Sequence, residues 1–156
     1  HSLNTTLIDS AQFIFAYQDV FESRHVQKFD PNDETELIDR HENVDVYSIN
    51  INLRKKNLFY GLEYYYNSVN SKAFITDDRE ENRVYPQTRY PNGGSSMSSI
   101  ASFASYRKNF TEKLRLNTGL RYTQNKLKAT FHSVPDVWEL PYDNISYNYI
   151  KLNVLS

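Results

Sequence analysis

Residues 114–122 read Leu-Arg-Leu-Asn-Thr-Gly-Leu-Arg-Tyr, and this stretch decides the fold of the chain. Its even positions are mainly leucine and end in tyrosine, whereas its odd positions include Arg115, Gly119 and Arg121. Side chains alternate between the two faces of a β-strand, so a strand here would have one apolar face and one face with two arginines. A helix would scatter the arginines around its circumference. The pattern therefore predicts a strand.

A second stretch repeats this frame. Residues 60–64, Tyr-Gly-Leu-Glu-Tyr, align with Thr-Gly-Leu-Arg-Tyr at 118–122. In both stretches glycine and a charged residue share one face, while leucine and tyrosine share the other. An arginine that faced lipid at the middle of a membrane would cost roughly 2–4 kcal/mol. The alternation avoids that cost by directing Arg115 and Arg121 to the inner side of a barrel.

The composition favours a sheet with an aromatic surface over a disordered chain. The mean hydropathy is −0.70, yet 15% of the residues are aromatic, and disordered chains are poor in aromatic residues. The net charge of −1 gives no general attraction to nucleic acid, so no nucleic-acid partner is expected. No run approaches the ~20 apolar residues of a transmembrane helix, but barrel strands need only ~9–11 alternating residues.

Prolines mark the connections between strands. All five lie within 30–40, 75–95 and 132–143, and proline cannot donate a hydrogen bond within a sheet. The expected fold class is all-β, an antiparallel up-and-down meander that forms a segment of a transmembrane β-barrel. We predict long loops at the three proline segments and six strands, near 10–25, 41–54, 58–73, 97–107, 114–131 and 144–156.

The second and third strands can be paired from the sequence. With Lys55 and Lys56 as the turn, the numbers of paired residues sum to 111 and every apolar residue meets an apolar partner. A slip by one residue would destroy this match. The predicted pairs are Leu53 with Leu58, Ile51 with Tyr60, Ile49 with Leu62, and Tyr47 with Tyr64.

The connections alternate in length and charge. The two short turns, 54–57 and 107–113, are basic, whereas the longer loops are rich in acidic residues. Short turns at one end and long loops at the other are typical of outer-membrane barrels. Tyr64, Tyr66 and Tyr122 stand toward the long-loop ends of their strands, where they would suit an aromatic girdle.

These patterns resemble the TonB-dependent outer-membrane receptors. The matching segments are Leu-Phe-Tyr-Gly-Leu-Glu-Tyr-Tyr-Tyr-Asn at 58–67, Thr-Arg-Tyr-Pro-Asn-Gly-Gly at 88–94 and Glu-Lys-Leu-Arg-Leu-Asn-Thr-Gly-Leu-Arg-Tyr at 112–122. The resemblance implies about six of the roughly 22 strands of such a barrel, and hence a piece of a longer protein. It also implies location in the outer membrane of a Gram-negative bacterium, where the barrel imports a siderophore, cobalamin, haem or glycan.

The resemblance implies partners as well. They are the lipid bilayer of the outer membrane, the transported small-molecule ligand, and a TonB-type energy-transducing protein contacted through parts absent from this chain. In the family's geometry the inward-pointing Gly61 and Gly119 would leave room for a plug; coiling of the sheet would explain them equally. The alternative function is a soluble all-β module that binds carbohydrate or another protein.

The loop 75–95 holds the candidate ligand contacts. Arginine offers a rigid fork for carboxylate or phosphate groups, and tyrosine offers a flat ring with a polar tip. Such a set would suit an anionic or sugar-bearing ligand, although a loop that merely covers the barrel mouth can have the same composition. The candidates are Arg79, Arg83, Tyr85, Arg89 and Tyr90.

No catalytic or metal site is predicted. His41 has acidic neighbours in sequence at Asp39 and Glu42, but without the spacing of a metal-binding motif. The acidic run at 77–81 has arginine neighbours that offset its charge. The sequence contains no recognisable Ser/His/Asp arrangement or phosphate-binding glycine loop. We therefore expect a protein that is not an enzyme and that has no cofactor.

Overall fold

The computed structural model describes residues 8–29, 35–77, 88–132, 141 and 143–155. These residues form one antiparallel sheet, in which each strand pairs with its neighbours in sequence. The predicted all-β, up-and-down fold is confirmed. Its strands are β1 (Ser10–Phe29), β2 (Thr35–Lys55), β3 (Leu58–Asp77), β4 (Ser95–Asn109), β5 (Arg115–Thr130) and β6 (Asn144–Leu155).

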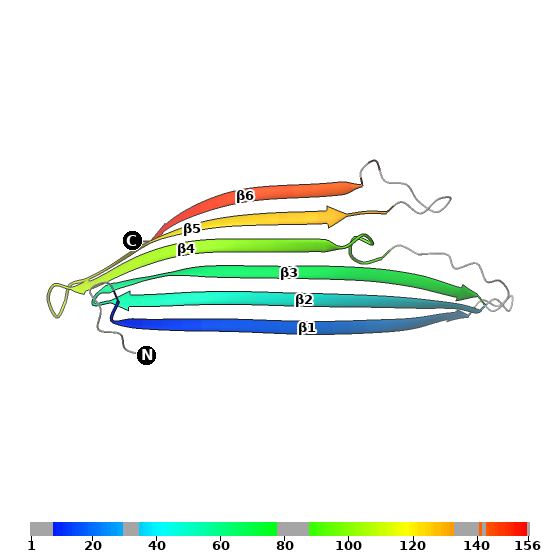
Figure 1. The fold of residues 1–156 in the computed structure, drawn as a ribbon, viewed down its shortest axis with the longest axis horizontal. Helices are drawn as coiled ribbons and strands as arrows, with labels where there is room; N and C mark the ends of the chain where they lie inside the picture. Colours follow the sequence, from blue (N-terminus) through cyan, green and yellow to red (C-terminus); the bar gives the residue numbers. More distant parts are fainter. Residues whose placement is uncertain (1–7, 30–34, 78–87, 133–140, 142, 156) are drawn as a thin grey trace.

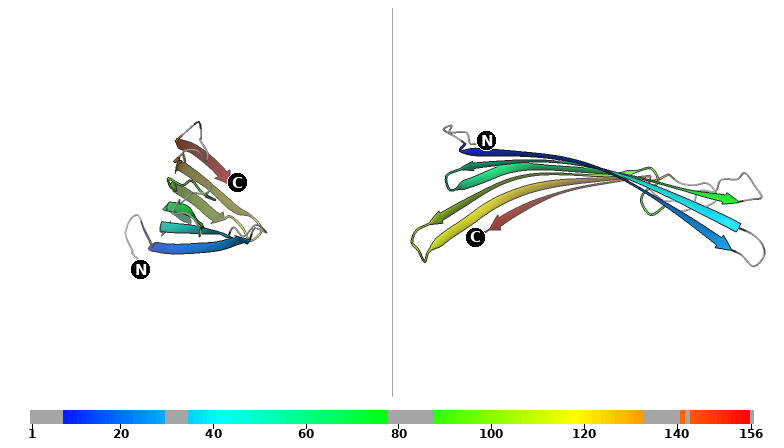
Figure 2. Two further views of the ribbon diagram at one scale, coloured as in Figure 1. Left: turned by 90° about the vertical axis from the view of Figure 1, so that its right-hand side faces the viewer. Right: turned by 90° about the horizontal axis from the view of Figure 1, so that it is seen from below.

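The sheet is open and twisted. Figure 1 shows the strands side by side, with β1 and β6 at the two edges. Figure 2 shows the strong twist and the bowing of the strands, which L-amino acids favour. The described part of the chain contains no helix, and so none that could cross a membrane. Within this part β1 and β6 each have one paired edge, and their outer edges carry unpaired backbone groups.

Three strands extend four to six residues beyond their predicted ends, and β4 (Ser95–Asn109) extends two residues beyond each of its own. β1, β2 and β3 have 20, 21 and 20 residues, and β2 already begins at Thr35. The predicted loop at 30–40 is therefore wrong in its second half. The apolar alternation ends near Asp45, but backbone pairing with β1 and β3 continues to the start of β2. Backbone hydrogen bonds need no apolar face, so this extension leaves no apolar signal in the sequence.

The pairing of β2 with β3 differs from the predicted register by two residues. The paired numbers sum to 113, so Ile51 lies opposite Leu62, and the predicted sum of 111 is wrong. The two-residue loop consists of Lys56, which has φ 48°, and Asn57. Both registers match apolar residues, because a shift by two preserves the face of every side chain. The prediction that these residues share one face is confirmed.

The sheet has two chemically different faces. We call the face that carries Leu62 and Leu120 the leucine face, and the opposite one, with Arg115 and Arg121, the arginine face. β6 follows the same division, since its Leu152 lies on the leucine face. The division into an apolar and a charged face that the stretch at 114–122 predicts therefore continues across the described strands of the sheet.

Few side chains are buried by this single layer. Among the described residues the buried apolar side chains are Ile38, Ala73 and Ala101, and the register places all three on the arginine face. On the leucine face Leu62 is 49% exposed and Ile150 is 59% exposed. A sheet normally buries its apolar face against a second layer. The described chain supplies no such layer for the leucine face.

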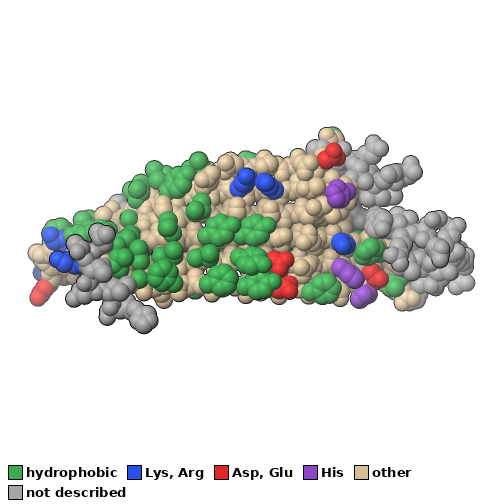
Figure 3. Space-filling view, viewed as in Figure 1, with side chains coloured by type: hydrophobic (Ala, Val, Ile, Leu, Met, Phe, Trp, Pro, Cys, Tyr) green, Lys and Arg blue, Asp and Glu red, His purple; other side chains and the backbone are tan. Residues whose placement is uncertain are grey.

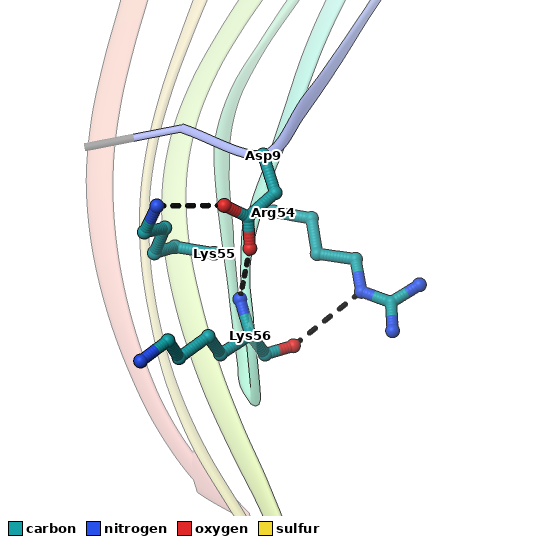
Figure 4. A network of polar contacts seen from close by, with 4 residues as sticks. All are labelled: Asp9, Arg54, Lys55 and Lys56. Atoms are coloured by element: carbon teal, nitrogen blue, oxygen red, sulfur yellow. Dashed lines mark hydrogen bonds and ion pairs between the residues drawn. The ribbon is translucent and has the colours of Figure 1, made fainter. Parts of the chain in front are cut away.

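Asp9 forms hydrogen bonds that link the start of β1 to the turn between β2 and β3 (Figure 4). Its carboxylate accepts hydrogen bonds from the Lys55 ammonium at 2.6 Å and from the Lys56 backbone N–H at 2.7 Å. The backbone N–H of Asp9 donates to the Arg54 carbonyl at 2.8 Å. The bond from Lys55, and then the bond from Lys56, lower the pKa of the Asp9 carboxyl below its ordinary value.

We expect this contact to weaken in acid. Because the folded-state pKa of Asp9 is lowered, its contribution to stability is present above the unfolded value of about 3.9 and is lost as the pH falls through the folded-state value. An NMR titration of the Asp9 carboxyl carbon should therefore give a midpoint below about 3.9. Asp9→Asn should remove this part of the pH dependence of unfolding. A midpoint at or above the ordinary value would contradict the contact with Lys55.

Candidate functional site

Leucine-face side chains form rows that run across all six strands. Three successive rows contain no charged residue, and we call them the uncharged band. Figure 3 shows this face, with hydrophobic side chains gathered over the half of the sheet nearer the short turns. From β1 to β6 the rows are Ala11, Leu53, Tyr60, Ala104, Leu120, Val154; Phe13, Ile51, Leu62, Ser102, Tyr122, Leu152; and Phe15, Ile49, Tyr64, Ile100, Gln124, Ile150.

Tyrosines border the uncharged band on its long-loop side. Tyr17, Tyr47 and Tyr66 lie side by side on β1, β2 and β3, with ring centroids 4.7 Å and 6.3 Å apart. The next row has Asp19 opposite Asp45, and the Tyr17 hydroxyl donates to Asp45 Oδ1 at 2.9 Å. A ring beside apolar neighbours with its hydroxyl bonded to a carboxylate suits a boundary between an apolar medium and water.

The predicted aromatic girdle matches this row only in part. Tyr66 belongs to it, whereas Tyr64 and Tyr122 lie within the uncharged band, one and two rows away. Tyr17 and Tyr47 were not recognised from the sequence. Their alignment depends on the register between β1 and β2, which the sequence prediction did not address.

Basic residues border the band on its short-turn side. The next row begins with Lys55 on β2 and continues through the uncharged Leu58, Tyr106 and Thr118, and Lys108 lies one row further along β4. The apolar stretch of β3 from 58 to 66 therefore spans nine residues. A strand that crosses the hydrocarbon core of a bilayer has about 9–11 residues. The apolar side of β3 therefore has the length that crossing a membrane requires.

Charges at the level of the band lie on the arginine face. Arg121 Nη2 reaches from β5 to Glu63 Oε2 on β3 at 2.6 Å, across β4. Ala101, which lies between them on β4, is 2% exposed, and its short side chain lets the two charged groups meet. Arg115 donates to Asn109 Oδ1 on the same face at 2.9 Å. The prediction that Arg115 and Arg121 share the face opposite the leucines is confirmed.

Phe103 lies over Gly61 on the arginine face. The two residues are opposite each other in the β3–β4 pairing, and a β-carbon built on Gly61 would lie 2.8 Å from Phe103 Cζ. The same ring is tilted against the ring of Phe59, with centroids 5.4 Å apart, and its centroid lies 6.0 Å from the Arg121 guanidinium carbon. Space beside Gly61 is thus filled by the neighbouring strand. Glycine permits this close approach because it has no side chain.

Imidazole and aromatic rings gather on the leucine face near the long-loop end. The His41 ring lies between Phe21 and Phe74, at centroid distances of 5.8 Å and 6.0 Å. His25 Nδ1 lies 2.5 Å from Asp39 Oδ1. Within the described ranges, no group of three or more histidine or carboxylate side chains is placed to hold a metal ion.

The candidate ligand residues are not brought together around a cavity in the described chain. Arg79, Arg83 and Tyr85 lie outside the described residues. The Arg89 guanidinium lies 3.9 Å from the Glu42 carboxylate on the arginine face, and Tyr90 is 40% exposed. The structure therefore leaves the ligand prediction for this loop untested.

The described end of this loop is tied to β5. The side-chain amide of Asn92 pairs with the backbone of His132 as a neighbouring strand would. It donates to the His132 carbonyl and accepts from the His132 N–H, both at 2.7 Å. The Gly93 N–H donates to the Thr130 carbonyl at 3.0 Å. These bonds fix the chain between 92 and the start of β4.

Comparison with known proteins adds no family to this geometry. No protein-family model, curated protein or solved structure matches the chain. The resemblance to TonB-dependent receptors stays a prediction, and the function has to be argued from the faces of the sheet.

Proposed function

We propose that this sheet is part of the wall of a transmembrane β-barrel in the outer membrane of a Gram-negative bacterium. The uncharged band carries the proposal, since its rows contain no Asp, Glu, Lys or Arg on any of the six strands. The resemblance at 58–67, 88–94 and 112–122 supports a barrel of the TonB-dependent receptor type. Such a barrel would import a nutrient, and the arginine face would line its interior.

The distribution of charge supports a lipid-facing surface rather than a water-facing one. A water-exposed sheet face has no reason to exclude charge, whereas each arginine or lysine at a bilayer midplane costs roughly 2–4 kcal/mol. The chain does carry charge at the same height, but places Glu63 and Arg121 on the opposite face. A soluble binding module would need neither this segregation nor the tyrosine border.

The open edges also support a larger barrel. The outer edge of β1, a strand of 20 residues, is a long row of unpaired backbone groups that would template aggregation in water. Barrels remove such edges by closing the sheet on itself. In the intact wall we expect the outer edges of β1 and β6 to pair with further strands.

Spin labels at single cysteines test the proposal, because the chain has no native cysteine. In lipid vesicles, labels at Leu62→Cys and Leu120→Cys should collide more with dissolved oxygen, which concentrates in hydrocarbon, than with a water-soluble nickel complex. A label at Asn50→Cys, on the arginine face, should show the reverse. Labels at both leucine positions that favour the nickel complex would contradict a membrane wall and favour the soluble binding module.

A further inference from the structure

Two lysines follow the uncharged band directly on β5. Lys126 and Lys128 lie on the leucine face, in the two rows after Gln124. Alternate residues of a strand point to the same side about 7 Å apart, so both ammonium groups can approach one phosphate. Their row neighbours on β4 and β6 all carry hydroxyl or amide groups, namely Ser96, Ser98, Ser146 and Asn148.

No carboxylate neutralises this lysine pair among the described side chains. The ion pairs among the described side chains involve cationic residues other than Lys126 and Lys128. Asp19 and Asp45 border the same band, but on β1 and β2, at least three strands away. Figure 3 shows a pair of blue side chains over the upper strands and a pair of red ones over the lower strands near the middle of this face, with further charged side chains toward its two ends. The border of the band is therefore positive, and rich in hydrogen-bond donors, over β4 to β6.

An apolar groove lies on the same face within the band. It has a volume of about 580 Å³, and the small side chains of Ser102 and Ala104 on β4 lie between bulkier ones on β3 and β5. Tyr122, which lines the groove, is four residues from Lys126, or about 13 Å along the strand. One leaflet of a bilayer has a hydrocarbon depth of about 15 Å. The groove is thus within reach of an acyl chain whose headgroup lies at the lysines.

We propose that this surface binds a phosphate-bearing membrane lipid, with its phosphate at Lys126 and Lys128 and an acyl chain in the groove over Ser102 and Ala104. This rests on the proposed function, because a bilayer must cover the leucine face for the groove to receive lipid. Ammonium and hydroxyl groups supply the charge and hydrogen bonds that phosphate oxygens accept. A choline headgroup carries its own cation, so a phosphate monoester headgroup should be preferred.

Native mass spectrometry of the full chain in detergent micelles tests this preference. With phosphatidic acid and phosphatidylcholine supplied together, we expect the chain to retain phosphatidic acid. Each lysine near an anionic headgroup contributes about fivefold, so Lys126→Gln with Lys128→Gln should reduce the preference about 30-fold. Arg107→Gln with Lys151→Gln is the matched control, because it removes the same charge from the arginine face and should retain the lipid.

Ser102→Leu tests the groove separately. It fills the space over β4 with an uncharged side chain and leaves both lysines in place, so retention of phosphatidic acid should fall while insertion persists. Unchanged retention in the double lysine variant, or equal loss in the arginine-face control, would overturn the proposal. Oxygen-favouring spin labels at Leu62 and Leu120 together with no lipid preference in the mass spectra would refute only the lipid site, whereas labels at both positions that favour the nickel complex would refute the barrel wall.

Discussion

Arginine in place of Leu62 is expected to block insertion of the sheet into lipid bilayers. Leu62 lies in the middle row of the uncharged band, between Ile51 and Ser102, and is 49% exposed. An arginine there would face hydrocarbon, at a cost of roughly 2–4 kcal/mol. This is a large part of the 5–15 kcal/mol that typically stabilises a folded protein, so the fraction that floats with phosphatidylcholine vesicles in a density gradient should fall sharply.

Asn50→Arg is the control for this experiment. Asn50 lies opposite Glu63 on the arginine face, where a new arginine would meet a carboxylate instead of lipid. Leu120→Arg, on β5, should behave like Leu62→Arg because Leu120 occupies the adjacent row of the band. Equal flotation of all three variants would contradict a lipid-facing leucine face.

Alanine in place of Gly61 is expected to destabilise the sheet by about 1–3 kcal/mol, the usual cost of forcing extra atoms into a packed site. The added β-carbon would lie 2.1 Å from the Ile51 carbonyl oxygen and 2.8 Å from Phe103 Cζ. A side chain can swing away, but a backbone oxygen moves only if the pairing of β2 with β3 is distorted. The free energy of unfolding, measured by urea titration in detergent micelles, should report the loss.

Gly119→Ala is the matched control, since Gly119 occupies the same sequence frame and the same face of the sheet. Its β-carbon would meet the Ala104 oxygen and Ser105 Cβ at 3.3 Å, where shifts of a few tenths of an ångström give relief. We expect a clearly smaller loss than for Gly61→Ala. A Gly61→Ala variant as stable as the native chain would show that the two strands do not approach this closely.

The assignment of side chains to faces was predictable because it depends only on parity. Alternation at 58–66 and 114–122 determines which residues share a face of the sheet. A shift of the pairing register by two residues does not change that assignment. The same property explains the wrong β2–β3 register: Leu53 meets an apolar partner whether it pairs with Leu58 or with Tyr60. Only the turn distinguishes these registers, and the left-handed conformation of Lys56 has no signal in the residue type.

Much of the candidate site depends on relations between strands that the sequence does not display. The tyrosine border needs two registers to align Tyr17, Tyr47 and Tyr66, and Lys126 can be placed in a binding surface only when its neighbours on β4 and β6 are known. The strand extensions beyond Asp45 were missed because polar residues can pair their backbones as well as apolar ones. Whether a residue occupies an odd or an even position predicts the face of the sheet on which it lies. Predicting a site also requires the pairing registers between the strands.

The ion pair between Glu63 and Arg121 has a consequence for the kinetics of assembly. Its partners are 58 residues apart and belong to strands that are not neighbours, so neither hairpin alone can bring them together. β4 must be joined on both of its edges before the pair can form. An interaction that forms after the rate-limiting step slows unfolding without accelerating folding. Where both pairings of β4 form after that step, the bridge across β4 prolongs the lifetime of the completed wall and leaves its folding rate unchanged.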